Sequence, residues 1–198
     1  MKRISQISLI QPLMKQPLFN ASEAKALGCS SALLCYYVKK GILERIDHGV
    51  YRNKDANIDV DVRYEDLVLA VKSIPEGIIC LVSALDLYDY TEEIPREYWI
   101  ALPHEKWAPK RKGVKIVRMR NTTIGITELK IGSETVPIFD RERTIIDSFR
   151  YLGKETAVKA LKTALSKKGK EKIDISKLRT YAKSLRVAID PYIIAVSI

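Results

Sequence analysis

The sequence predicts an α+β protein in which a small winged helix-turn-helix domain precedes a mixed α+β domain. Three observations lead to this prediction. Two short capped helices and a hairpin stand near the N-terminus, a polar segment without periodicity covers residues 53–62, and strand candidates followed by helices occupy the rest. We therefore expect one domain over residues 1–57 and another over residues 63–198, with the boundary in the polar segment.

The N-terminal elements carry clear start and stop signals. Apolar residues at spacings of three and four predict a short amphipathic helix over residues 3–14, which Pro12 interrupts. Asn20, with Glu23 three positions on, is a variant of the capping box and predicts a helix over residues 21–27 that ends at a glycine.

Ser30 caps a second predicted helix, over residues 31–40, which ends in two lysines and a glycine. Strand-like pieces over residues 43–46 and 50–52 then flank a tight turn that contains His48. Two helices and a hairpin in this order predict a winged helix. A helical pair with a hairpin and no role in DNA binding is the alternative.

The second predicted helix has two chemically different faces at 100° per residue. Leu33, Leu34, Tyr37 and Val38 form the apolar face that packs inward. In a winged helix the opposite face enters the major groove. That face consists of Ser31, Ala32, Cys35, Tyr36 and Lys39.

Phosphate contacts are expected around this helix, from its capped start and from cations at its end and in the wing. The candidates are Ser30, Lys39, Lys40, Arg45, Arg52 and Lys54, with His48 at the tip of the wing. The presumed reading face lacks Arg, Asn and Gln, which make bidentate contacts to bases. Sequence choice would then depend on DNA shape, the wing or a second copy.

The net charge of +10 is unevenly distributed. Residues 1–57 carry a balance of +5, residues 58–100 of −7, and residues 101–198 of +12. A basic domain is the electrostatic footprint of a nucleic-acid binder, although solubility alone accounts for a similar total.

The second domain is predicted to be a mixed α+β domain with helices on one face of a small sheet. The predicted helices cover residues 64–73, 79–88, 141–151, 156–166 and 175–185. The predicted strands cover residues 97–102, 114–120, 125–131 and 134–138.

This domain carries a second possible basic surface without any acidic residue. Its members are Lys106, Lys110, Arg111, Lys112, Lys115, Arg118 and Arg120. Three interpretations stay open: a solvated surface, a second nucleic-acid contact to which Trp107 adds stacking, and a site for an acidic partner protein.

Several segments resemble one family. Residues 19–28, together with residues 38–52, which read VKKGILERIDHGVYR, resemble the N-terminal domain of AbiEi antitoxins. Residues 81–85 (LVSAL), 98–103 (YWIALP) and 141–147 (RERTIID) are similar to further recurring segments of that family.

The resemblance implies the antitoxin of a type IV toxin–antitoxin or abortive-infection operon. Such a protein represses its own operon by binding inverted repeats in double-stranded DNA. It opposes a nucleotidyltransferase-like toxin without necessarily forming a stable complex with it, and antitoxin action is associated with its C-terminal domain. A stand-alone winged-helix regulator without a partner toxin is the alternative.

Enzyme signatures are incomplete, so we expect no enzyme and no cofactor. Asp59 and Asp61 have the spacing of paired nucleotidyltransferase carboxylates, but the upstream Gly-Ser phosphate loop is missing, and helix capping explains them better. Glu128 and Lys130 have the spacing of a nuclease Glu-x-Lys, but residues 98–127 contain no aspartate. A DNA-processing enzyme with a nuclease-like C-terminal domain is a further alternative.

Metal, disulfide and membrane signals are also weak. Cys29, Cys35 and Cys80 are scattered, and His48 and His104 lie far apart, so neither a disulfide framework nor a zinc site is expected. The apolar runs fall far below the roughly 20 residues that span a bilayer, and no secretory signal is expected. We expect a cytoplasmic protein without a membrane partner.

Overall fold

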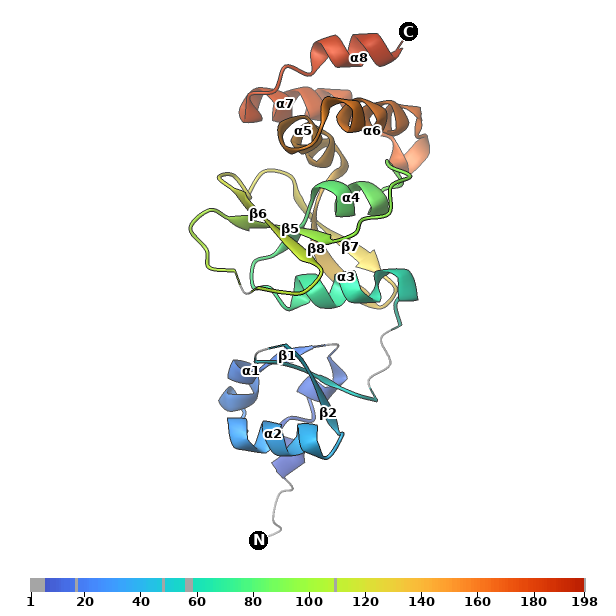
Figure 1. The fold of residues 1–198 in the computed structure, drawn as a ribbon. Coiled ribbons are helices and arrows are strands. Elements are labelled where there is room, and N and C mark those ends of the chain that lie inside the picture. The colour runs from blue at the N-terminus through green and yellow to red at the C-terminus, as the bar shows by residue number, and fades with distance from the viewer. Residues whose placement is uncertain (1–5, 17, 48, 56–58, 109, 198) are drawn as a thin grey trace. The chain divides into compact units, whose positions relative to one another are not determined.

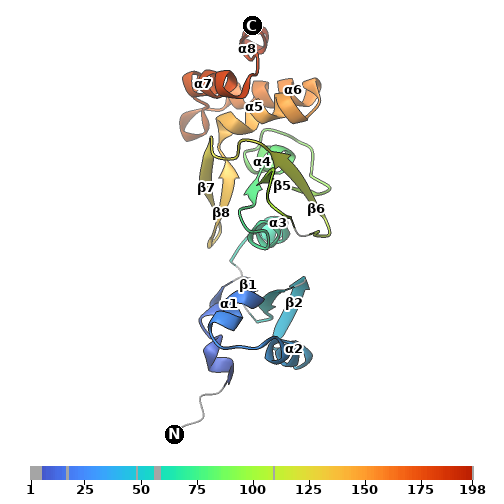
Figure 2. The ribbon, with the colours of Figure 1, turned by 90° about the vertical axis from the view of Figure 1, so that its left-hand side faces the viewer.

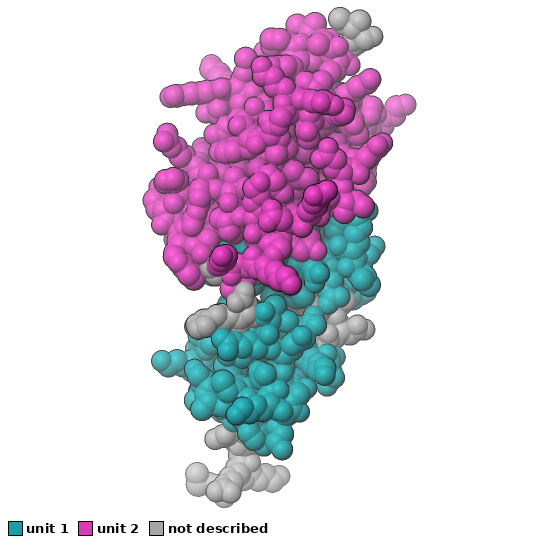
Figure 3. Space-filling model, viewed as in Figure 1, with its two compact units in different colours: residues 1–75, 130–134 teal, residues 76–129, 135–198 magenta. Residues whose placement is uncertain are grey.

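The computed structural model describes residues 6–16, 18–47, 49–55, 59–108 and 110–197 (Figures 1 and 2). It confirms an α+β protein. The chain divides into two compact units: residues 1–75 with 130–134 form unit 1, and residues 76–129 with 135–198 form unit 2 (Figure 3). The predicted boundary segment, residues 53–62, lies inside unit 1, and residues 56–58 of it are outside the described residues.

Unit 1 opens with two 3-10 turns, η1 (Gln6–Leu9) and η2 (Leu13–Lys15). The amphipathic α-helix predicted over residues 3–14 is therefore wrong in type, and residues 3–5 of it lie outside the described residues. Pro12 explains the break because it has no amide hydrogen to continue a helical hydrogen-bond ladder. It is the N-cap residue of η2, so a separate turn begins there. Ile10 is nevertheless fully buried.

The helix-turn-helix consists of β1 (Phe19–Asn20), α1 (Ala21–Ala26) and α2 (Ser31–Lys39). Both predicted caps are confirmed. The amide of Asn20 donates to the carboxylate of Glu23 at 2.6 Å, and the amide of Leu33 donates to Oγ of Ser30 at 3.3 Å. Gly28, with φ of +86°, makes the turn between the helices in a backbone conformation that suits glycine.

The wing is the hairpin of β2 (Leu43–Asp47) and β3 (Val50–Asn53), as predicted, while His48 in its turn lies outside the described residues. Strand β1, which was not predicted, adds to the other edge of β3, so the antiparallel sheet has the order β1-β3-β2. Two residues are too few to show strand periodicity, and β1 is defined only by its pairing with β3, Phe19 with Tyr51 and Asn20 with Val50.

Two apolar clusters hold unit 1 together. The cluster of the helix-turn-helix comprises Ile10, Leu13, Phe19, Ala24, Cys29, Leu34, Tyr37, Leu43 and Tyr51. A smaller cluster joins the sheet to α3 (Val62–Lys72) through Leu18, Val50 and Leu69. Helix α3 thus belongs to the same compact unit as the wing.

Residues 130–134 are also part of unit 1. The amide of Ser133 donates to the carbonyl of Asp59 at 2.7 Å, and Lys72 forms an ion pair with Glu134. Gly132 has φ of +60°, and a Cβ atom there would overlap the carbonyl of Asp59. Glycine is therefore required at this position by both the backbone conformation and the close approach.

Unit 2 is built on a five-stranded mixed sheet of order β6-β5-β4-β8-β7. Its strands are β4 (Ile78–Ile79), β5 (Tyr98–Pro103), β6 (Val114–Met119), β7 (Ile126–Ile131) and β8 (Glu134–Phe139). Strand β4 runs antiparallel to β5 and parallel to β8, and β5 is parallel to β6. The four predicted strands are confirmed.

The helix predicted over residues 79–88 is shorter than expected. Ile79 pairs with Ile100 and Ile138 in the middle of the sheet, and the helix begins only at Leu81. A short apolar run does not distinguish a buried strand from the start of a buried helix, so the pattern alone misplaced this boundary.

The helices of unit 2 lie on one side of the sheet, with α4 against β5 and the others beyond α4 (Figures 1 and 2). They are α4 (Leu81–Leu87), α5 (Arg141–Tyr151), α6 (Lys154–Ser166), α7 (Ile175–Leu185) and α8 (Asp190–Ser197), with the 3-10 turn η3 (Gly169–Glu171) before α7. Asp140 caps α5 by accepting from the amide of Arg143 at 2.8 Å. Helix α8 was not predicted.

Candidate nucleic-acid interface

Helix α2 buries one face and exposes the other, as its sequence predicts. Leu34 and Tyr37 are buried in the core of unit 1, and Leu33 and Val38 pack against that core. The exposed side chains are Ser31, Ala32, Cys35, Tyr36, Lys39 and Lys40. Since the buried face fixes the rotation of the helix, the position of the exposed face is determined by packing alone.

Tyr36 is the most prominent group of the exposed face, with 52% of the residue exposed. Its ring packs edge-on against Tyr37, with centroids 5.7 Å apart, and Nζ of Lys40 lies 5.8 Å from its centroid. The ring is thus held by contacts on the helix while about half of the residue stays exposed. Such a group can contact a base edge or a phosphate, and Lys40 adds a charge beside it.

The cations expected to contact phosphates have different surroundings. Lys39, Lys40, Arg45 and Lys54 are exposed. Ser30 is exposed as well, and its Oγ already accepts the capping hydrogen bond of α2. His48 lies outside the described residues.

Two carboxylates hold the guanidinium of Arg52. Nε donates to Glu44 at 2.8 Å and Nη1 donates to Glu65 at 3.1 Å. Burial opposes the charge of Arg52, but these hydrogen bonds outweigh it and raise the pKa of the guanidinium. Sequence reasoning could not find this arrangement, since Glu65 lies on another element 13 positions away.

The second basic surface, in unit 2, contains several cations with intramolecular partners. Lys106 forms an ion pair with Glu76 at 2.7 Å, and Lys115 lies 3.7 Å from the ring centroid of Trp99. Arg118 donates to the carbonyls of Pro103 and Lys106 and thereby ties β6 to the loop after β5. Lys110, Lys112 and Arg120 are exposed, and Arg111 is half-buried.

Trp107, in the same loop, is 82% exposed. Its indole is available for stacking, as the sequence suggested, but it stands on a loop rather than on a rigid helix.

The residues of the two enzyme interpretations are placed as structural or surface groups. Asp61 caps α3 by accepting from the amide of Arg63 at 2.9 Å, which confirms the capping explanation for Asp61, whereas Asp59 is exposed two residues before this cap. Glu128 and Lys130 are exposed on β7, an edge strand. Over the described ranges, no three His, Cys, Asp or Glu side chains come together as metal ligands.

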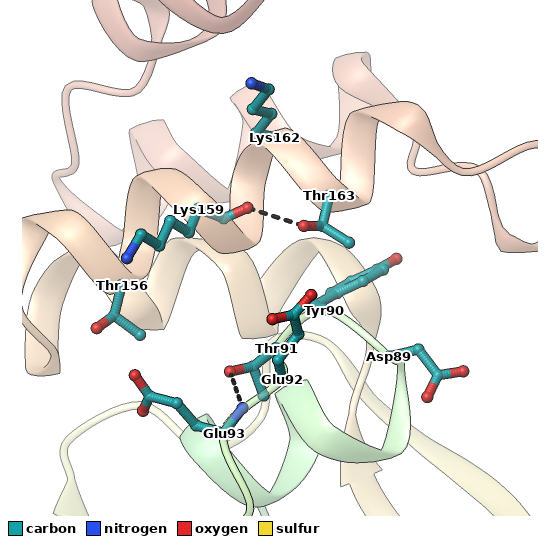
Figure 4. A pocket seen from close by; sticks show the side chains of 9 residues that line it. All are labelled: Asp89, Tyr90, Thr91, Glu92, Glu93, Thr156, Lys159, Lys162 and Thr163. Carbon is teal, nitrogen blue, oxygen red and sulfur yellow. Dashed lines mark hydrogen bonds between the residues drawn. The ribbon is translucent and has the colours of Figure 1, made fainter.

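Unit 2 also has a pocket of about 450 Å³ between α6 and the segment that follows α4 (Figure 4). Its lining residues are Asp89, Tyr90, Thr91, Glu92, Glu93, Thr156, Lys159, Lys162 and Thr163. Thr91 accepts from the amide of Glu93, and Thr163 donates to the carbonyl of Lys159, so both hydroxyls serve the fold. The charges are mixed, and sequence reasoning did not single this pocket out.

Comparisons with known proteins agree with the geometry of unit 1. Residues 13–54 match a family described as "Transcriptional regulator, AbiEi antitoxin". The match covers β1, both helices of the helix-turn-helix and the wing, and it confirms the resemblance of residues 19–28 and 38–52 to the N-terminal domain of that family. No curated protein matches the chain. No helix of the described residues is long and apolar enough to cross a membrane.

Proposed function

We propose that this protein is a DNA-binding transcriptional repressor that acts as the antitoxin of a type IV toxin–antitoxin operon, because residues 13–54 match the AbiEi antitoxin family of transcriptional regulators. The observation that carries the proposal is the exposed face of α2, which a buried apolar face holds in place and which Tyr36 and two lysines occupy. This helix docks in the major groove, and its N-terminal half faces base edges.

Phosphate contacts come from Ser30 at the start of α2, from Lys39 and Lys40 at its end, and from Arg45 and Lys54 in and after the wing. These contacts set affinity, while sequence preference comes from the few soft contacts of α2 and from DNA shape. Two copies bound to inverted repeats add the remaining specificity. The target is the protein's own promoter.

Gel-shift titration with the DNA upstream of the protein's own gene tests this function. We expect a shift without metal ions, and a weaker shift with a shuffled sequence of the same composition. Cleavage of the same DNA in the presence of Mg²⁺ would support the alternative of a DNA-processing enzyme instead.

The antitoxin activity is assigned to residues beyond about 62, and the opposed toxin is nucleotidyltransferase-like. The separate basic surface of unit 2 favours this assignment, with its exposed Lys110 and Lys112 beside Arg111. Charge reversal of these three residues should impair protection of cells from the toxin encoded beside the gene. If the variant folds and protects normally, this surface is only a solvated face without a role in protection.

A further inference from the structure

Strand β3 is the central strand of the sheet in unit 1, and packing covers both of its faces. Successive side chains of a strand point to opposite faces. Tyr51 belongs to the core of the helix-turn-helix, whereas Val50 packs with Leu18 and with Leu69 of α3. The main strand of the wing is therefore held between the helix-turn-helix and α3.

Arg52 continues the face of β3 that meets α3. Arg52 stands two residues after Val50 on β3, and Glu65 stands one helical turn before Leu69 on α3. The ion pair of Arg52 with Glu65 therefore lies beside the apolar contact of Val50 with Leu69. Glu44 is directly opposite Arg52 on β2. A single guanidinium thus joins both strands of the wing to α3.

This arrangement leaves Arg52 poorly suited to a DNA phosphate. Two carboxylates around one guanidinium leave an excess of one negative charge, which repels a phosphate. Only 27% of the Arg52 side chain is exposed. The carboxylates engage Nε and Nη1, so a phosphate could use only the remaining donors of the fork.

We propose that Arg52 is a positioning residue: it fixes the wing against α3 and does not itself neutralise a DNA phosphate. The proposal rests on the proposed DNA-binding function, because it assigns one residue's part in that function. It makes α3, an element outside the helix-turn-helix and the wing, a determinant of wing geometry.

The first experiment measures hydrogen exchange of the full chain without DNA, so its result does not depend on the proposed function. Glu65→Gln weakens the ion pair while keeping the shape of the side chain. We expect amides of β2 and β3 to exchange about threefold faster, because local opening of the wing becomes easier. Glu155→Gln, which removes a carboxylate from the exposed pair with Lys159 on α6, should leave them unchanged.

The second experiment measures binding to the upstream DNA as a function of salt. Loss of a negative charge by itself strengthens DNA binding, and Asp55→Asn, an exposed acid just after the wing, provides that control. Glu65→Gln should nevertheless weaken binding several-fold, because the wing is no longer fixed.

Substitutions at Arg52 separate positioning from charge. Arg52→Ala should lower affinity without changing the slope of log K against log salt, whereas Lys54→Ala should lower the slope by about one. Arg52→Lys keeps the charge but loses the planar fork, and it should behave like Arg52→Ala.

Two results would overturn the proposal: unchanged exchange of the wing in Glu65→Gln, or tighter DNA binding in that variant together with a slope lower by about one in Arg52→Ala. Failure of the wild-type protein to bind DNA would contradict the proposed function, and the exchange experiment would still decide whether Arg52 couples the wing to α3.

Discussion

The lysines at the end of α2 and the cations of the second basic surface are used differently. In unit 1, Lys39 and Lys40 are exposed at the end of a helix whose rotation is fixed by its buried face. In unit 2, Lys106, Lys115 and Arg118 contact a carboxylate, an indole ring and backbone carbonyls of the same unit. A count of charges therefore overestimates the second surface as a binding site, because part of its charge stabilises loops.

Arg143, which is fully buried, is the clearest case of a cation that stabilises the fold. Its Nε donates to Asp147 at 2.7 Å, and its two Nη atoms donate to the carbonyls of Ile124 and Asn121 at 2.7 and 2.8 Å. Arg150 also pairs with Asp147, at 2.8 Å. The loop between β6 and β7 is thereby fixed to α5.

The largest expected effect follows from this buried network. Arg143→Ala leaves the carboxylate of Asp147 with Arg150 alone and two carbonyls without donors. The substitution should reduce the free energy of unfolding by about 3–5 kcal/mol, the cost of breaking a buried pair. Urea denaturation measures the change, and a loss below about 1 kcal/mol would mean that this cation is not structural.

The next effect concerns the reading face of α2. Tyr36→Ala removes an exposed ring without opening the core, so stability should change little. Affinity for the upstream DNA should fall about fivefold, roughly 1 kcal/mol, while affinity for shuffled DNA changes less. Fluorescence anisotropy with both DNAs measures the ratio of the two affinities. Equal losses of affinity for the two sequences would mean that Tyr36 takes no part in sequence recognition.

A smaller, non-specific effect is expected at the end of the same helix. Lys39→Ala should weaken binding to both DNAs equally and lower the slope of log K against log salt by about one. Lys183→Ala, at a lysine that is also exposed, on α7, is the matched control. If the control lowers the slope as much as Lys39→Ala does, the DNA extends over unit 2 and the contrast between the surfaces fails.

The smallest effect is expected at Lys115, whose ammonium lies over Trp99. Lys115→Met keeps the length of the side chain and removes its charge. We expect a loss of about 0.5 kcal/mol in the free energy of unfolding, the size of an exposed cation–π contact. The slope of DNA binding against salt should stay unchanged, and a lower slope would instead identify Lys115 as a DNA contact.

The sequence predicted the elements whose signals are local. Ser30 and Asp140 mark helix starts by their own side chains, and the two faces of α2 follow from its periodicity. Strands β1 and β4 were missed because each has two residues and is defined only by its partners.

The candidate site shows the same limit. The exposed face of α2 could be read from spacing, but the roles of individual cations depend on distant partners. Glu65 and the carbonyls around Arg143 come from other elements, and no local sequence pattern predicts these contacts. Composition therefore identified the basic surfaces, but it did not show which of their cations have intramolecular partners that stabilise the fold.

The most direct test of the central claim, that α2 presents the DNA-reading face, uses Cys35. This thiol is exposed on that face, whereas Cys29 and Cys80 are buried and burial raises the pKa of both, so alkylation at neutral pH should modify Cys35 selectively. A matched control places the thiol on α7 by Ser184→Cys in a Cys35→Ser background. Saturating upstream DNA should slow alkylation of Cys35 at least about tenfold and leave the α7 thiol unaffected. An unchanged rate at Cys35 in DNA-bound protein would contradict the account.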